Sequence, residues 1–132
     1  MAGQARTSAQ AAERAIASGN YLGPLHGVPI AVKDLCFTKG VPTMGATKAL
    51  INHVPNFDCT VVQKLNAAGA VILGKLNLTE GAMAGYNPEF QVPVNPWGSH
   101  LRSGASSSGS GVATAAGSVS YTHLTLPTIL LV

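Results

Sequence analysis

The sequence carries little charge for its length. Of its 132 residues only 10% are charged, and the formal net charge of +3 comes from single, scattered positions. Binding to nucleic acids or to membrane surfaces depends on clusters of basic residues, so we expect neither partner. The apolar fraction is high at 46%, which is typical of segments that are covered on both sides in a larger α/β body.

Long apolar runs and metal-binding motifs are missing as well. No stretch is long enough to cross a bilayer as a helix, and residues 1–12 lack the apolar core of a signal peptide. Cys36 and Cys59 are too far apart in the sequence for a metal or redox motif, and the four histidines match no ligand spacing. We therefore predict no metal, no cofactor, reduced thiols and a cytoplasmic location.

Serine and glycine are concentrated in residues 103–117, which have the sequence SGASSSGSGVATAAG. A flexible linker has this composition at its start, but it does not continue into small apolar helix formers. We therefore predict a tight loop that leads into a buried helix, with Gly117 at the C-terminal cap.

Two common glycine-rich loops do not fit this stretch. A phosphate-binding loop ends in Gly-Lys-Ser or Gly-Lys-Thr, and the chain has only Gly-Lys-Leu at residues 74–76, far upstream. A nucleophile elbow needs G-x-S-x-G, and Ser108 stands where its last glycine belongs.

A third type does fit, because residues 104–110, GASSSGS, resemble the serine-rich signature of the amidase signature family, usually GGSSGGS. Four upstream stretches resemble the same family in the expected order: GPLHGVPIAVKD at 23–34, KGVPT at 39–43, GAVILGKLNLTE at 69–80 and NPW at 95–97. The chain is thus identified as a member of this family, whose members are several times longer.

Sequence patterns also predict the secondary structure before the serine-rich loop. We expect a helix over 5–18, a strand over 28–32, a helix from about 58 to 69 and a fully apolar strand over 70–73. Pro29 cannot donate a ladder bond, so the first strand should begin irregularly or lie at an edge. The alternation indicates a layered α/β fold. The resemblance implies a mixed β-sheet covered by helices, of which this chain is a part.

Finer predictions concern the helix ends. Asp58 is expected to be the N-cap of the second helix. The buried face of that helix should carry Val61, Val62, Leu65 and Ala68. Thr79 should cap a brief helix, and residues 86–102 should form an irregular loop.

The resemblance implies amide hydrolysis by a nucleophilic serine, which is activated through a second serine on a cis peptide bond and a lysine. Lys33 matches the lysine, which must be neutral to act as a base and so needs burial; the alternative is an ordinary lysine that extends to solvent from a strand end. Ser106 matches the cis-serine, although Ala105 precedes it instead of the commoner glycine. The supporting loop would consist of Gly104, Ala105, Ser107, Ser108 and Gly109.

Other polar and aromatic residues have open roles. Ser107, Ser108 and Ser110 are expected to make hydrogen bonds at the helix start rather than to catalyse. Asp34 would orient Lys33 or a neighbouring loop, or serve as a cap. Tyr86 and Trp97 would pack in the interior or line a substrate channel.

The nucleophile has no match. Family spacing puts it where Leu130 stands, within a Thr-Gly-Gly-Ser type of turn whose amides form the oxyanion hole. Residues 119–132 resemble adaptor read-through, so we interpret them as an artefactual, non-family tail, with a natural C-terminal strand as the alternative. Residues 1–118 would then be the N-terminal part of a truncated amidase signature domain, and the chain as written should be inactive.

Three functions stay open at this point. The leading one is an amidohydrolase fragment whose full-length form acts on small-molecule carboxylic amides, alone or as a homodimer. The second is the amidase subunit of a glutamyl-tRNA(Gln) amidotransferase, although the usual Asp-Glu-Phe-Ala-Met of that protein is TEGAM at residues 79–83. The third is a fragment with no catalysis of its own.

Overall fold

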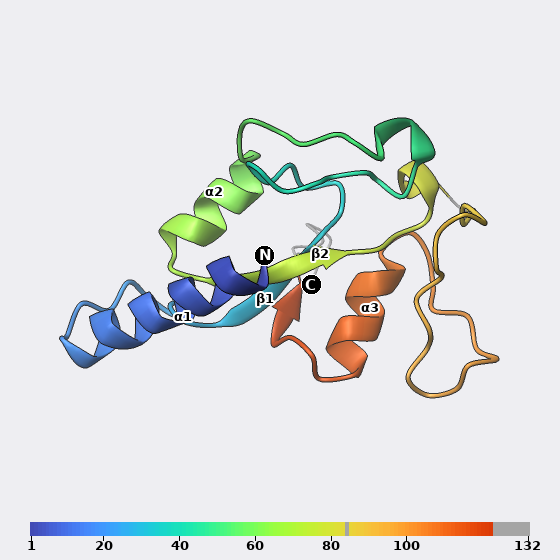
Figure 1. The fold of residues 1–132 in the computed structure, drawn as a ribbon. Coiled ribbons are helices and arrows are strands. Elements are labelled where there is room, and N and C mark those ends of the chain that lie inside the picture. Colours follow the sequence, from blue (N-terminus) through green and yellow to red (C-terminus); the bar gives the residue numbers. More distant parts are fainter. Residues whose placement is uncertain (84, 123–132) are drawn as a thin grey trace, which may run out of the picture.

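A three-stranded parallel sheet forms the centre of the computed structural model, which describes residues 1–83 and 85–122 (Figure 1). The strands are β1 (Pro29–Lys33), β2 (Val71–Leu76) and β3 (Tyr121–Thr122), in the order β2-β1-β3. The α/β fold class is confirmed. Among the described strands every pairing is parallel, so an antiparallel component of the expected mixed sheet is not found in this part of the chain.

Helices cover both faces of this sheet. α1 (Ala2–Ala17) lies along β2, while α2 (Thr60–Ala67) and α3 (Ser108–Ala115) lie on opposite sides of the sheet (Figure 1). Two short 3-10 helices, η1 (Lys48–Leu50) and η2 (Glu80–Ala82), interrupt the connecting loops. Residues 86–102 form no helix or strand, as predicted.

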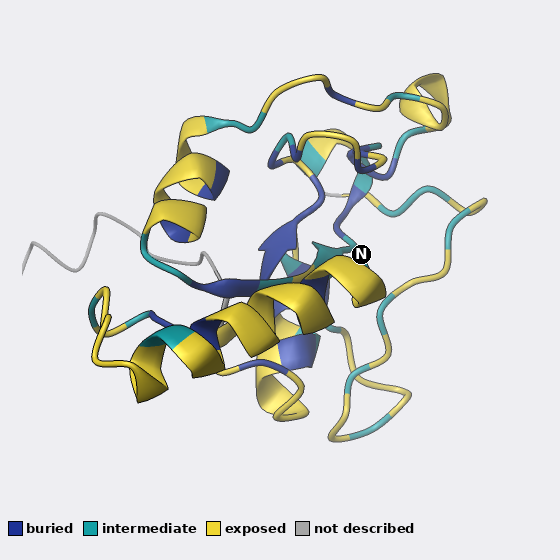
Figure 2. Cartoon of the chain, turned by 60° about the vertical axis from the view of Figure 1, so that its left-hand side comes forward, coloured by how far each residue is buried: buried dark blue, intermediate teal, exposed yellow. Residues whose placement is uncertain are grey.

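β1 is the centre of the core, and Figure 2 shows it dark blue between helices whose outer surfaces are exposed. One apolar cluster joins β1 to α2 through Ile30, Val32, Val62 and Leu65. A second cluster on the other side contains Ala31, Ala113 and Val119. Because side chains alternate along a strand, Lys33 shares the face of Ala31, which α3 covers.

The first strand and its neighbour differ in detail from the prediction. Pro29 is the first residue of β1, which is central, so Pro29 marks a strand start and not an edge. β2 extends to Leu76 and contains one extra residue, because Ile30 pairs with Ile72 whereas Val32 pairs with Lys75. Leu73 is 39% exposed, so the described residues do not cover this strand on both faces as we expected.

One predicted helix cap is wrong, and a second is correct in position but makes no capping hydrogen bond. Cys59, not Asp58, occupies the N-cap position of α2, because the Asp58 carboxylate instead accepts the backbone N–H of Lys39 at 2.6 Å. Val61 was expected on the buried face of α2, but it is 42% exposed and lies outside that face. Thr79 stands at the N-cap of η2 as predicted, but its hydroxyl accepts no helix N–H and instead donates to the Met83 carbonyl.

The beginning of the expected tail packs onto the sheet. Val119 is buried, the Ser120 N–H donates to the Pro29 carbonyl at 3.1 Å, and β3 pairs with β1. The assignment of residues 119–132 to a non-family tail stays a prediction, and residues 123–132 lie outside the described part of the chain.

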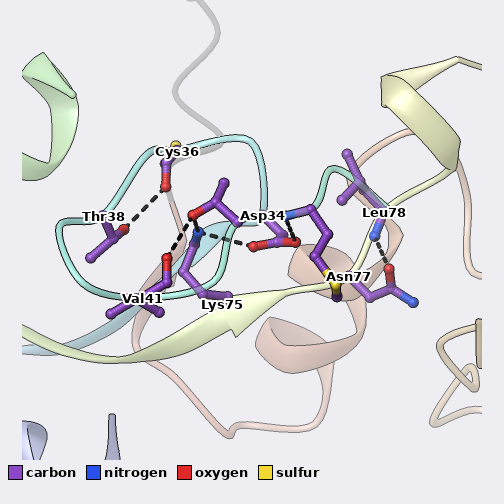
Figure 3. Close-up of polar contacts among 9 residues, drawn as sticks. Asp34, Cys36, Thr38, Val41, Lys75, Asn77 and Leu78 are labelled. Atoms are coloured by element: carbon purple, nitrogen blue, oxygen red, sulfur yellow. Dashed lines mark hydrogen bonds and ion pairs between the residues drawn. The ribbon is translucent and has the colours of Figure 1, made fainter. Parts of the chain in front are cut away.

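A buried ion pair holds the loop that follows β1. Asp34 Oδ1 lies 2.9 Å from Lys75 Nζ without the alignment of a hydrogen bond, and both side chains are about nine-tenths buried. Figure 3 shows the two side chains pointing toward one another. Asp34 Oδ2 accepts the Met44 N–H at 2.9 Å, and Lys75 Nζ donates to Thr43 Oγ1 at 2.7 Å. The pair therefore fixes residues 43–44 against the ends of β1 and β2.

The start of α3 is fixed by close backbone contact with the end of β2. The Gly109 N–H donates to the Asn77 carbonyl at 3.0 Å, and the Thr79 N–H donates to the Ser106 carbonyl at 3.2 Å. A Cβ atom on Gly109 would lie only 2.5 Å from that carbonyl oxygen of Asn77, whereas one on Gly111 would meet nothing within 4 Å. Only glycine allows α3 to lie this close to the strand.

We predict that removing one partner of the buried ion pair is costly. Lys75→Met leaves Asp34 buried without its counter-charge and should lower the free energy of unfolding by about 3–5 kcal/mol. The control is Lys48→Met, which breaks the exposed Lys48–Glu89 pair and should cost less than about 1 kcal/mol. Urea unfolding followed by circular dichroism measures both values, and equal losses would contradict the assignment.

The two glycines of α3 give a second prediction. Gly109→Ala should destabilise the chain by about 1–3 kcal/mol, because its methyl group overlaps the Asn77 backbone. Gly111→Ala should be neutral or stabilising by up to about 1 kcal/mol, because alanine favours a helix. Thermal unfolding of the two variants tests this, and a Gly109→Ala variant as stable as Gly111→Ala would show that the contact is loose.

Candidate active site

Lys33 and Ser106 meet on the face of the sheet that α3 covers. Lys33 Nζ donates a hydrogen bond to Ser106 Oγ at 2.7 Å, although 73 positions separate the two residues in the sequence. Lys33 is the last residue of β1, and Ser106 lies two residues before the first turn of α3. Two residues that the sequence assigns to one site are therefore in direct contact.

The loop before Ser106 has the unusual backbone that the prediction named. The Ala105–Ser106 peptide bond is cis, and Gly104 has a positive φ of 77°. The Tyr86 hydroxyl donates to the Gly104 carbonyl at 2.7 Å, so Tyr86 holds this loop from outside. Of the two open roles for Tyr86, the contact supports packing. Trp97 is 80% exposed and packs into no interior.

The surroundings of Lys33 favour its neutral form. Only 8% of its surface is exposed. Burial lowers the pKa of the Lys33 amine from its usual value, and the nearby Cys36 thiol opposes this effect by raising it. Because an ammonium group is more costly to bury than an amine, the shift follows from the position of Lys33 at the end of a buried strand.

The serines after Ser106 do not behave as expected. Ser107 is the N-cap residue of α3 but makes no capping hydrogen bond through its side chain. Ser108 and Ser110 are 1% and 0% exposed, and their hydroxyl oxygens have no hydrogen-bond partner among the described residues. The prediction that these three side chains bond to the helix start is therefore wrong. Close packing of α3 against the end of β2 buries the hydroxyls instead.

Sequence reasoning missed Lys75 and Thr43, and it left the role of Asp34 open. Asp34 orients a neighbouring loop through its contacts with Met44 and Lys75, which was one of its expected roles. In the sequence Lys75 lies within the family-like stretch 69–80, but its only other context was a Gly-Lys-Leu that fails as a phosphate-binding loop. A lysine within an otherwise apolar strand was the signal that it needed a buried partner.

An open groove of about 640 Å³ lies beside this site and is not centred on it. Asp34, Lys75, Asn77 and Gly109 contribute to its wall, and residues 90–94 form the other side. Neither Lys33 nor Ser106 lines it. The ion pair and the start of α3 thus line the groove, whereas the neighbouring Lys33–Ser106 contact does not.

The described part of the chain contains neither a candidate metal-binding cluster nor a helix suited to span a membrane. Among residues 1–83 and 85–122 no three His, Cys, Asp or Glu side chains are grouped to hold a metal ion. Within the same residues no helix has both the length and the apolar character to cross a membrane. The position expected for the nucleophile, Leu130, lies outside them.

Comparison with known proteins connects this geometry to a family. The family model named Amidase matches residues 1–123. The amidase named AmiD of Mycobacterium tuberculosis is 56% identical over 113 residues, which are 86% of this chain and 24% of that protein. A glutamyl-tRNA(Gln) amidotransferase subunit of Anaeromyxobacter dehalogenans is 47% identical over 120 residues, or 89% of this chain and 24% of that one.

A solved structure of an amidase is also similar to this chain. The peptide amidase of Stenotrophomonas maltophilia superposes with a TM-score of 0.83 at 34% identity, covering 90% of this chain and 26% of that enzyme. The chain thus spans about a quarter of the length of the relatives it matches. Since the family model accounts for nearly all of its residues, the chain belongs to the amidase family.

Proposed function

We propose that this chain supplies the lysine and the cis-serine of an amidase that hydrolyses carboxylic amides through an acyl-serine intermediate. The observation that carries the proposal is the 2.7 Å hydrogen bond between the buried Lys33 amine and Ser106 Oγ. Ser106 is also the residue that follows the cis peptide bond. Family membership supports amide hydrolysis in general. The assignment of the two residues to a catalytic triad is our own.

In this mechanism Lys33 is the base and Ser106 is the relay. A nucleophilic serine attacks the amide carbonyl carbon, its proton passes to Ser106 Oγ, and the Ser106 proton passes to the lone pair of neutral Lys33. The C–N bond then breaks as the proton returns through Ser106 to the leaving nitrogen, which departs as ammonia or an amine. Water releases the acyl group by the same relay. Burial lowers the pKa of the Lys33 amine, which favours the neutral form that this role requires.

The nucleophile must come from sequence other than the described residues. Leu130 stands at its expected position, so we propose that residues 1–118 are the N-terminal part of the catalytic domain and that the 132-residue chain alone is inactive. A cytoplasmic location and a homodimer of the full-length form likewise remain proposals.

A second candidate is transfer of ammonia from glutamine, which the similarity to the glutamyl-tRNA(Gln) amidotransferase favours. The same Lys33–Ser106 relay would serve, because the first half of that reaction is also hydrolysis of an amide. The two functions differ in whether free ammonia is released from simple amides or whether turnover depends on glutamine and a partner protein. Simple amides and glutamine, each assayed for ammonia release, distinguish them.

The first test joins residues 1–118 to the remainder of AmiD, which is 56% identical in this region. We expect the 132-residue chain to release no ammonia and to remain unlabelled by a fluorophosphonate. The hybrid should release ammonia and should be labelled. Lys33→Ala and Ser106→Ala should each lower the hydrolysis rate of the hybrid by about 10²- to 10⁴-fold, because the proton relay is lost.

Two lysine variants serve as controls for this test. Lys33→Arg keeps a positive charge but cannot act as a base, so it should be as inactive as Lys33→Ala. Lys64→Ala removes an exposed lysine on α2 and should leave the rate unchanged. Full activity of Lys33→Arg would contradict the assignment of Lys33 as the base.

The pH dependence gives a further prediction. Only neutral Lys33 accepts a proton, so hydrolysis by the hybrid should rise as pH rises through the pKa of Lys33 and fall by about tenfold per pH unit below it. Because burial lowers this pKa, the midpoint should lie below that of a solvent-exposed lysine. Values of kcat/KM across neutral and alkaline pH measure the midpoint. A profile that is flat over this range would remove Lys33 from the base role.

A further inference from the structure

The two cysteines meet at the base of the loop that follows Lys33, which their distance in sequence did not indicate. Cys36 follows β1, and its backbone N–H donates to the Lys33 carbonyl at 2.9 Å. Cys59 precedes α2, and its backbone N–H donates to the Phe37 carbonyl at 2.9 Å. One hydrogen bond thus places the backbone of Cys59 directly beside the segment that contains Cys36.

Their side chains are in contact as well. Cys36 belongs to the apolar cluster between β1 and α2, and Cys59 packs against the same cluster. The neighbouring Cys59 is also among the groups that raise the pKa of the Cys36 thiol. The pair is not joined in a disulfide. Cys36 is 9% exposed, whereas Cys59 is only partly buried. The pair therefore consists of one buried cysteine and one that is more exposed to solvent.

We propose that Cys36 and Cys59 are a redox-sensitive pair, which closes to an intramolecular disulfide when the folded chain meets a peroxide. A disulfide forms only where two Cβ atoms come within about 4.5 Å of each other. The bond from the Cys59 N–H to the Phe37 carbonyl and the shared apolar cluster bring the two cysteines onto neighbouring backbone segments. The two cysteines are too far apart in the sequence for a redox motif, and only the fold brings their backbone segments together.

The chemistry assigns a different step to each thiol. Hydrogen peroxide oxidises the sulfur of Cys59 to a sulfenic acid and is itself reduced, with one molecule of water leaving. The sulfur of Cys36 then attacks the sulfur of Cys59, the S–O bond breaks, and the departing hydroxide takes the Cys36 proton to form a second water. Two thiols lose two electrons in total, and the peroxide gains them.

Burial explains why Cys59 reacts first. Desolvation by burial, together with the neighbouring Cys59, raises the pKa of the Cys36 thiol to about 11, against the opposing effects of Lys75 and Lys33. At neutral pH Cys36 therefore stays protonated and hidden, and a protonated thiol is a poor nucleophile toward an oxidant. It reacts once a sulfenic acid has formed beside it, since the hydroxide that leaves removes its proton.

The test uses the 132-residue chain, in which these are the only two cysteines. Folded protein is exposed to hydrogen peroxide, unfolded, alkylated with iodoacetamide and analysed by intact mass and peptide mapping. We expect both thiols to be lost together as one monomeric, linked product, which dithiothreitol reverses. The same reaction in urea should be several-fold slower, because the contact between the thiols is lost.

Matched single variants separate the two roles. Cys36→Ser should stop at a sulfenic acid on Cys59, which dimedone traps, and Cys59→Ser should leave Cys36 unmodified under the same exposure. The proposal is overturned if wild-type Cys59 accumulates higher oxides without linkage, if the only disulfide joins two chains, or if Cys36 in Cys59→Ser reacts as fast as Cys59 does in Cys36→Ser. None of these readouts depends on amidase activity, so the proposed function stands or falls separately.

Discussion

The parallel pairing of β1 with β2 positions the buried ion pair, the start of α3 and Lys33. Parallel strands end at the same edge of a sheet, so pairing of Lys33 with Leu76 brings the polar residues after β1 to those at the end of β2. The contact between Asp34 and Lys75 follows from this register. The position of α3 also follows from this register. The Asn77 carbonyl accepts the Gly109 N–H at the start of α3, and the Thr79 N–H donates to the Ser106 carbonyl. A shift of one residue would send Lys33 to the opposite face of the sheet.

Two buried lysines lie close together at this edge, and their partners give them different chemistry. Lys75 faces the Asp34 carboxylate and the Thr43 hydroxyl, so its positive charge is compensated, and it acts as a structural cation that holds the neighbouring loop. Lys33 donates to a serine hydroxyl, and burial lowers the pKa of its amine. A carboxylate partner stabilises an ammonium group, whereas burial disfavours it and lowers the pKa of the amine. The same residue type therefore serves as a structural ion in one position and as a proposed proton acceptor in the other.

The serine-rich loop shows how packing limits the number of serines that share a chemical role. Ser106 contacts Lys33, whereas Ser108 and Ser110 are buried with no hydrogen-bond partner among the described residues. Gly109, between them, lies against the Asn77 backbone. Tight docking of α3 on β2 therefore requires small side chains at its first turn, and serine meets that requirement even where its hydroxyl is unpaired. An unpaired buried hydroxyl costs about 1–3 kcal/mol, which the surrounding packing must offset.

Motifs and local periodicity in the sequence predicted the family, the α/β class, the order of α1, β1, α2, β2 and α3, and the Lys33–Ser106 pair. They did not predict β3, which lies in the residues interpreted as a tail. Only the tertiary structure decided the partners of Asp34 and Lys75, the contact of Cys36 with Cys59 and the N-cap of α2. Each of these depends on which distant segment packs against a side chain. Asp58, for example, has the sequence context of a cap, but its carboxylate accepts the Lys39 N–H instead. Periodicity fixes the face of a residue, whereas its partner follows from strand register and loop closure, which no local pattern encodes.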